Sequence, residues 1–283
     1  VGWYNYCLLI HKIATMKKIF IIGAFVSVLA SCTQNAITGR NQLSLLSEAE
    51  LQNMAVQEYR QFLSQNKVVS PSGNKDAEMV RRVGQRLTTA ITNYYKGQGL
   101  ASELEGFQWE YNLVDAKEVN AWCMPGGKIV VYTGLLPVTQ NEAALAVVVG
   151  HEIAHAVAKH GNERMSQALV AEGIGTIGGA VTSGNAKVNS LFNSIYGPRA
   201  TIGVVLANSR KQELEADKFG LIFTAMAGYN PQEAVPLWQR MQQMSNGQRP
   251  PEFLSTHPTE ENRIARLQAL MPEALKYYKP MGK

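Results

Sequence analysis

The sequence is short of net charge. Its 283 residues carry 27 basic and 22 acidic side chains, and three of the lysines lie before residue 32, so the remainder has 24 basic residues against 22 acidic ones. Proteins that bind nucleic acid usually carry a basic patch or stripe for the phosphate backbone, and no such stripe of lysine and arginine is present here. We therefore expect no nucleic-acid partner.

Cysteine is also scarce, with three in the whole chain: Cys7, Cys32 and Cys123. Cys7 and Cys32 lie within or at the end of a leader segment, which leaves Cys123 without a partner for an intrachain disulfide. A lone cysteine in an apolar context is typically a small packed hydrophobe, with a reactive thiol as the alternative.

The amino-terminal segment has the order of a bacterial lipoprotein signal. Met16 is followed by two lysines, an apolar stretch over residues 19–28, and Leu-Ala-Ser ending at Cys32. The apolar stretch is too short to span a bilayer, which takes about 20 residues. The ending resembles the lipobox, in which the cysteine is acylated and becomes the first mature residue. We therefore expect a signal peptide at 16–31, preceded by an upstream extension at 1–15.

This interpretation places the protein outside the cytoplasm, held at a membrane by the lipid on Cys32. An uncleaved anchor, or a plain secretory signal with a chance cysteine, is the alternative. Thr33 follows the cysteine, where an aspartate would resemble an inner-membrane retention signal. The outer membrane, facing the periplasm, is therefore the favoured location.

The rest of the chain predicts a short tether at 32–46 and one α+β, mostly helical domain at 47–283. That length is ample for a single hydrophobic core. From 107 to 132 apolar and polar residues alternate as is typical of strands, so we expect a small β-sheet there. From Thr139 onward the pattern is helical again.

A metal-binding motif lies in the helix that follows. Thr139 and Glu142 form a capping box that begins this helix, an apolar run predicts its burial, and His151-Glu152-Ile153-Ala154-His155 comes next. Residues four apart lie above one another on a helix, so both imidazoles can reach one metal ion, with Glu152 beside them. The motif predicts a catalytic Zn²⁺ site beside the small sheet.

A catalytic zinc site needs a third protein ligand and one open position. His160 points elsewhere around the helix, and we expect it to be structural. A later helix offers Glu213 and Asp217 on one face, and Gly220 continues that face, which would let another helix approach closely. Glu213 is the predicted third ligand, whereas Glu215 is expected on a solvated face.

Four motifs together resemble the M48 family of metallopeptidases: HExxH, Ser-Arg-x-x-Glu-x-x-Ala-Asp at 209–217, Asn-Ala to Pro-Gly-Gly at 120–127, and Thr-His-Pro at 256–258. The likeness runs from about Thr38 to about Arg266. It implies a zincin-like fold of the gluzincin type with one zinc ion. The roles it implies are zinc ligation by His151, His155 and Glu213 and general base catalysis by Glu152. It also implies that Asp217 contacts a ligand histidine without itself binding the metal.

The resemblance also implies a substrate-binding edge strand beside the metal. An unpaired strand edge can hold an extended peptide through backbone hydrogen bonds. The alternative, which is compatible with this one, is an ordinary core strand. The strand residues are Lys128, Ile129, Val130, Val131, Tyr132 and Thr133.

Two further residues have predicted roles at the metal. Arg263 is a candidate for stabilising the oxyanion, although an arginine near a helix start can instead pair with Glu260 or Glu261. His257 in the Thr-His-Pro motif can reach the metal in the resembling family and displace the catalytic water, as a latch. The alternative is a loop histidine that bonds backbone or substrate.

The predicted function is a zinc endopeptidase that cleaves unfolded or misassembled envelope proteins, with Glu152 taking the proton of a zinc-activated water. Two other readings stay open. A zinc amidase would act on small or cell-wall amides in a closed pocket. A zinc-stabilised chaperone or assembly factor of the envelope would tolerate the loss of Glu152, because a structural zinc needs no base.

Overall fold

The computed structural model describes residues 32–173, 185–196, 210–245, 253 and 262–280. No helix within these ranges is both long enough and apolar enough to cross a membrane. The strands and longer helices are β1 Cys32–Gln34, β2 Asn41–Leu43, α2 Glu48–Gln65, β3 Val68–Val69, α3 Lys75–Gly97, β4 Glu110–Val114, β5 Ala121–Met124, β6 Lys128–Tyr132, α4 Leu136–Thr139, α5 Glu142–Val157, α6 His160–Ala171, α7 Ala186–Tyr196, α8 Arg210–Met226, α9 Ala234–Ser245 and α11 Arg263–Leu275.

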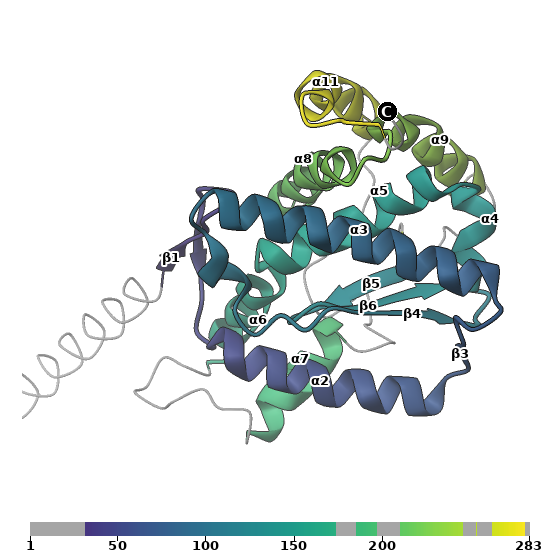
Figure 1. Ribbon diagram of the computed structural model, residues 1–283. Coiled ribbons are helices and arrows are strands. Elements are labelled where there is room, and N and C mark those ends of the chain that lie inside the picture. Colours follow the sequence, from purple (N-terminus) through teal and green to yellow (C-terminus); the bar gives the residue numbers. More distant parts are fainter. Residues whose placement is uncertain (1–31, 174–184, 197–209, 246–252, 254–261, 281–283) are drawn as a thin grey trace, which may run out of the picture.

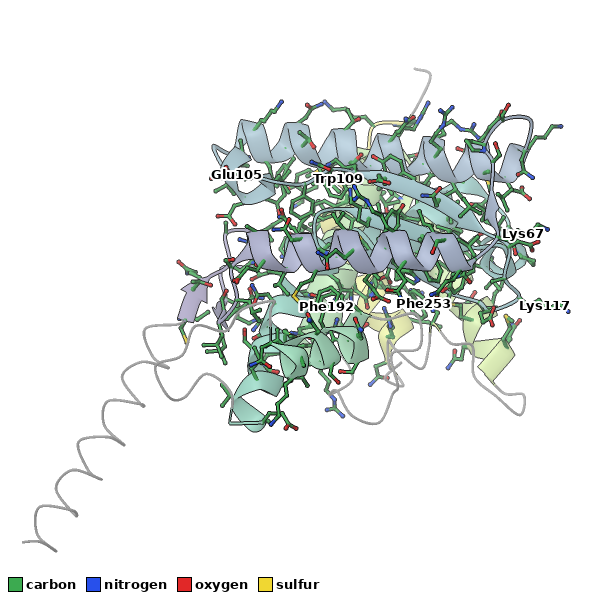
Figure 2. The ribbon with its side chains drawn as sticks, turned by 90° about the horizontal axis from the view of Figure 1, so that it is seen from below. Lys67, Glu105, Trp109, Lys117, Phe192 and Phe253 are labelled. Carbon is green, nitrogen blue, oxygen red and sulfur yellow. The ribbon has the colours of Figure 1, made fainter. Side chains whose placement is uncertain are left out.

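A four-stranded sheet in the order β3-β4-β6-β5 divides the core into two layers. Helices α3 and α5 cover one face and α2 covers the other (Figure 1). Residues alternate between the faces along β6: Ile129 and Val131 pack in the first layer, and Val130 and Tyr132 in the second. Phe192 of α7 completes the second layer, where Figure 2 shows it beside α2.

The prediction that residues 128–133 form an edge strand is wrong. Strand β6 is paired on both sides, parallel to β4 and antiparallel to β5, and all five of its residues are buried. Its backbone groups are therefore used within the sheet and cannot bind a peptide. Thr133 lies just beyond it, at the start of a short 3₁₀ turn. Among the described strands, the edge nearest the HExxH helix is β5.

Residues 32–46, predicted as a short tether, include a hairpin that packs against the rest of the domain. Strands β1 and β2 pair as an antiparallel hairpin, and two buried amides fix it to the carboxyl end of α5. Asn35 and Gln42 each donate from their side-chain nitrogen to the carbonyl oxygen of Ala158, at 3.0 and 2.9 Å. A helix ends with unsatisfied carbonyls, and here the hairpin supplies the donors.

Helix α5 begins at an asparagine cap rather than at the predicted capping box of Thr139 and Glu142. The Asn141 side-chain oxygen accepts a hydrogen bond from the Ala144 amide at 2.8 Å. Thr139 belongs to the preceding short helix α4, where its hydroxyl donates to the Leu136 carbonyl. The cap fixes where α5 starts and therefore which way its histidines face.

Helices α5 and α8 cross at two glycines. A Cβ on Gly220 would lie 2.9 Å from the backbone nitrogen and Cα of His151, and a Cβ on Gly150 would lie 3.0 Å from the Gly220 carbonyl oxygen. The predicted close approach at Gly220 is confirmed. Without side chains at the crossing, the first turns of α8 lie directly against the metal-binding motif of α5.

Candidate metal centre

Three buried side chains from α5 and α8 converge on one point. The Nε2 atoms of His151 and His155 are 3.1 Å apart, and Glu213 places one carboxylate oxygen 3.5 Å from the first and the other 3.4 Å from the second. Tetrahedral zinc with bonds of about 2.0–2.1 Å holds its ligand atoms about 3.3 Å apart. The two imidazoles and one carboxylate therefore have both the chemistry and the spacing to hold a zinc-sized cation.

The outer nitrogen of His151 contacts a carboxylate, as predicted. Its Nδ1 lies 3.0 Å from an Asp217 oxygen, so this imidazole can donate to Asp217 while its Nε2 faces the metal position. Such carboxylate partners fix the tautomer and orientation of a ligand histidine. Asp217 follows Glu213 by one helical turn, which is why one helix supplies both groups.

Arg263 is buried behind these carboxylates. Its guanidinium donates to Asp217 at 2.6 Å, lies 3.5 Å from Glu213, and stacks 3.6 Å above the ring of Trp238. With only 2% of its surface exposed, it balances buried negative charge. Its proposed contact with an oxyanion stays a prediction, and Glu260 and Glu261 lie outside the described residues.

Glu152 lies between the two histidines in the sequence of α5, and its side chain is buried. Burial raises the pKa of the Cys123 thiol well above its usual value, and the nearby Glu152 charge raises it further. Cys123 is therefore an un-ionised packed side chain, as expected for a lone cysteine in an apolar setting. The effect of its charge on Cys123 shows that Glu152 lies near strand β5, which carries Cys123.

The surroundings shift the pKa values of the two ligand histidines in opposite directions. Burial lowers the pKa of His151, but Asp217 and Glu213 outweigh it and raise the pKa to about 9. Burial lowers the pKa of His155 well below its usual value. A cation held by both Nε2 atoms needs both imidazoles unprotonated at those atoms, so metal binding is expected to weaken as the pH falls.

His160 and Glu215 have closer roles than the sequence indicated. His160 is fully buried, with its Nδ1 2.8 Å from the Nδ1 of His155 and its Nε2 2.8 Å from a Glu215 oxygen. The predicted solvated face for Glu215 is wrong, because its carboxylate also pairs with Arg40. Neither contact follows from helical periodicity, since the partners come from separate segments.

Arg164 is a second cation near the site, and the sequence did not point to it. Burial lowers its pKa, while Tyr196 and the carboxylates of Glu213 and Glu152 act in the opposite direction.

His257 lies outside the described residues, so its predicted approach to the metal is supported by the sequence alone.

A comparison with protein families decides the classification. The sequence profile described as Peptidase family M48 matches residues 77–271. The chain belongs to peptidase family M48. This membership and the His151, His155 and Glu213 cluster confirm the expected mostly helical, zincin-like fold class.

Curated relatives of this M48 protein are named as metalloendopeptidases or proteases. It is 34% identical over 184 residues to the mitochondrial metalloendopeptidase OMA1 of Saccharomyces cerevisiae, covering 62% of this chain and 51% of the relative. The human OMA1 metalloendopeptidase is 31% identical over 246 residues, 85% of this chain and 46% of the relative. The Escherichia coli beta-barrel assembly-enhancing protease is 30% identical over 165 residues, 56% of this chain and 33% of the relative. The chain thus spans about half or less of each of these three.

We predict that Glu213→Gln lowers zinc affinity by more than about 100-fold, because changes in outer-shell partners alone cost 10- to 100-fold and this change removes a charged ligand. Chelator competition with purified protein measures the affinity. Glu273→Gln is the matched control, since Glu273 forms only a half-exposed ion pair with Lys218. Affinity within about threefold of wild type would show that Glu213 is not a ligand.

Proposed function

We propose that this M48 protein is a zinc-dependent endopeptidase that cleaves unfolded or misassembled proteins of the cell envelope. The observation that carries the proposal is the buried cluster of His151, His155 and Glu213, with Glu152 on the same helix. That helix packs against β5, whose outer edge no described strand covers. The name of the Escherichia coli relative, a beta-barrel assembly-enhancing protease, supports an envelope substrate.

The site residues divide the work between holding the metal and moving a proton. His151, His155 and Glu213 would hold a zinc ion, which would supply a Lewis acid and would lower the pKa of water in the site. Glu152 accepts the proton of the attacking water and delivers it to the leaving amine.

Strand β5 offers the backbone groups that an extended substrate needs. The Tyr132 amide donates to the Asn120 carbonyl, so Asn120 and, by alternation, Trp122 direct their backbone groups toward β6. Ala121 and Cys123 then direct theirs toward the outer edge, with which no described strand pairs. The Ala121 N–H donates to the Asn120 side-chain oxygen at 2.9 Å, so a substrate strand would have to replace that hydrogen bond. Phe253 donates to the Val119 carbonyl at one end of the same edge. We infer that substrate adds to β5 as a further strand.

An open edge also bears on the rival functions. Backbone pairing selects an extended chain with little regard to side chains, which suits a peptidase acting on unfolded protein. A small-amide hydrolase has no use for such an edge. A chaperone without catalysis would use the edge but would not need Glu152.

We predict that Glu152→Gln lowers kcat for an unfolded protein substrate by about 10²- to 10⁴-fold, because general acid–base catalysis contributes that much. The variant should keep about one zinc per chain, as measured by metal analysis, because all three ligands are intact. Glu142→Gln, at the start of the same helix, is the control. Undiminished proteolysis by Glu152→Gln would refute the mechanism. If the wild-type protein shows no proteolysis but still holds unfolded proteins in solution, the chaperone would be favoured.

We predict that N-methylation of a peptide substrate raises KM only at alternate residues. Strand addition uses every second substrate N–H, and losing one hydrogen bond of about 1 kcal/mol raises KM by roughly 3- to 10-fold. A series of peptides, each methylated at one position, measures the pattern by steady-state kinetics, with the intervening positions as internal controls. Equal sensitivity at all positions would argue against binding to β5.

We propose that the protein is a lipoprotein acylated at Cys32, which is exposed at the start of β1. The expected result for protein produced in bacteria with its leader is a mature chain that begins at Cys32 and carries acyl chains, seen by intact-mass analysis. The Cys32→Ser variant, which cannot be acylated, should no longer be found in the membrane fraction. An unmodified Cys32 would exclude the anchor.

A further inference from the structure

The amino-terminal hairpin reaches the metal site through one arginine. Arg40 forms ion pairs with two carboxylates. Its Nε lies 2.7 Å from a Glu215 oxygen, and its Nη1 and Nη2 lie 2.5 and 2.7 Å from the two oxygens of Glu163. Glu163 also accepts from Gln212 of α8 at 2.7 Å. Arg40 therefore joins the hairpin, α6 and α8 at a single point, and it lies before residue 77, where the family match begins.

Glu215 connects Arg40 to the buried imidazole of His160. One Glu215 oxygen lies 3.2 Å from Nη2 of Arg40 and 2.8 Å from Nε2 of His160. An ionised carboxylate only accepts hydrogen bonds, so the proton in this contact belongs to His160 Nε2. In a neutral imidazole the other nitrogen, Nδ1, is then an acceptor.

The acceptor of His160 faces a ligand of the metal. His160 Nδ1 and His155 Nδ1 are 2.8 Å apart, and only one of them can donate. Because His160 Nδ1 accepts, His155 must carry its proton on Nδ1, and its Nε2 lone pair is left to face His151 and Glu213. The hydrogen bond from His160 to Glu215 thus fixes the direction of the hydrogen bond between His155 and His160.

We propose that His160 is a positioning residue that sets the tautomer and orientation of His155 for metal binding, and that Arg40 holds His160 in place through Glu215. The inference rests on the proposed metal site. The two ligand histidines are then supported differently. The Asp217 carboxylate contacts His151 directly, whereas His155 contacts the imidazole of His160, which in turn contacts the Glu215 carboxylate. The hairpin is part of the metal-binding unit.

Three substitutions at His160 separate positioning from simple packing. Asn places its amide oxygen where Nδ1 lies and keeps the acceptor for His155, but it does not reach Glu215. Gln places its amide nitrogen near Nε2 and keeps the contact with Glu215, but it offers His155 no acceptor. Leu keeps neither.

The measurement is the zinc affinity of the full chain by chelator competition, with the melting temperature of the metal-free form as a check on folding. We expect His160→Leu and His160→Gln to weaken zinc binding by about 10- to 100-fold and His160→Asn by only a few-fold, since outer-shell partners contribute that much. If His160 merely neutralises Glu215, Gln will retain more affinity than Asn, and the proposal is wrong.

Arg40 provides a second and independent test. Arg40→Met should weaken zinc binding by about 10-fold, while Arg82→Met, which removes the ion pair with Glu142 at the opposite end of α5, should leave it unchanged. Because Arg40 acts through His160, adding Arg40→Met to His160→Leu should cause no further loss.

Two outcomes overturn the relay in different ways. Additive losses in the double variant would show that Arg40 acts by another route. Wild-type protein that binds no zinc would end both this inference and the proposed function, whereas normal zinc binding in all the variants would end this inference alone.

Discussion

The close crossing of α5 and α8 is the constraint on which the rest of the site depends. Gly150 and Gly220 remove the side chains that would hold these helices apart, and the backbone of α8 lies against His151. Only at this distance can a glutamate from α8 share a cation with two histidines of α5. The same crossing brings Asp217 to the outer nitrogen of His151, so one packing contact sets both a ligand and its support.

Burying this site places several carboxylates in one region, and their charges must be balanced. Glu152, Glu213 and Asp217 are each at least 93% buried. Arg263 donates to Asp217 and is enclosed by Trp238, which reduces the cost of burying the negative charge. A bound dication would balance the remainder, and this physical demand agrees with the donor set of two imidazoles and one carboxylate.

The polar contacts continue outward from the ligands to the amino-terminal hairpin. Asn35 and Gln42 satisfy the Ala158 carbonyl beyond the end of α5, while Arg40 pairs with carboxylates of α6 and α8. The hairpin begins at Cys32, the proposed point of membrane attachment. The segment expected to be a tether therefore packs against the helix that carries the motif, so the proposed lipid attachment point and the candidate metal ligands lie in neighbouring parts of the fold.

The sequence by itself determined the features that depend on local periodicity and residue chemistry. The spacing of His151 and His155 puts them on one helical face whatever surrounds them, Glu213 and Asp217 share a face for the same reason, and the motif set was sufficient for the family. Only the tertiary structure decided which of the described strands lies at the edge of the sheet, because pairing on both sides of β6 involves residues far apart in the chain. It likewise decided the roles of His160 and Glu215. Their contacts join segments 55 residues apart, and no local pattern encodes a distance of that kind.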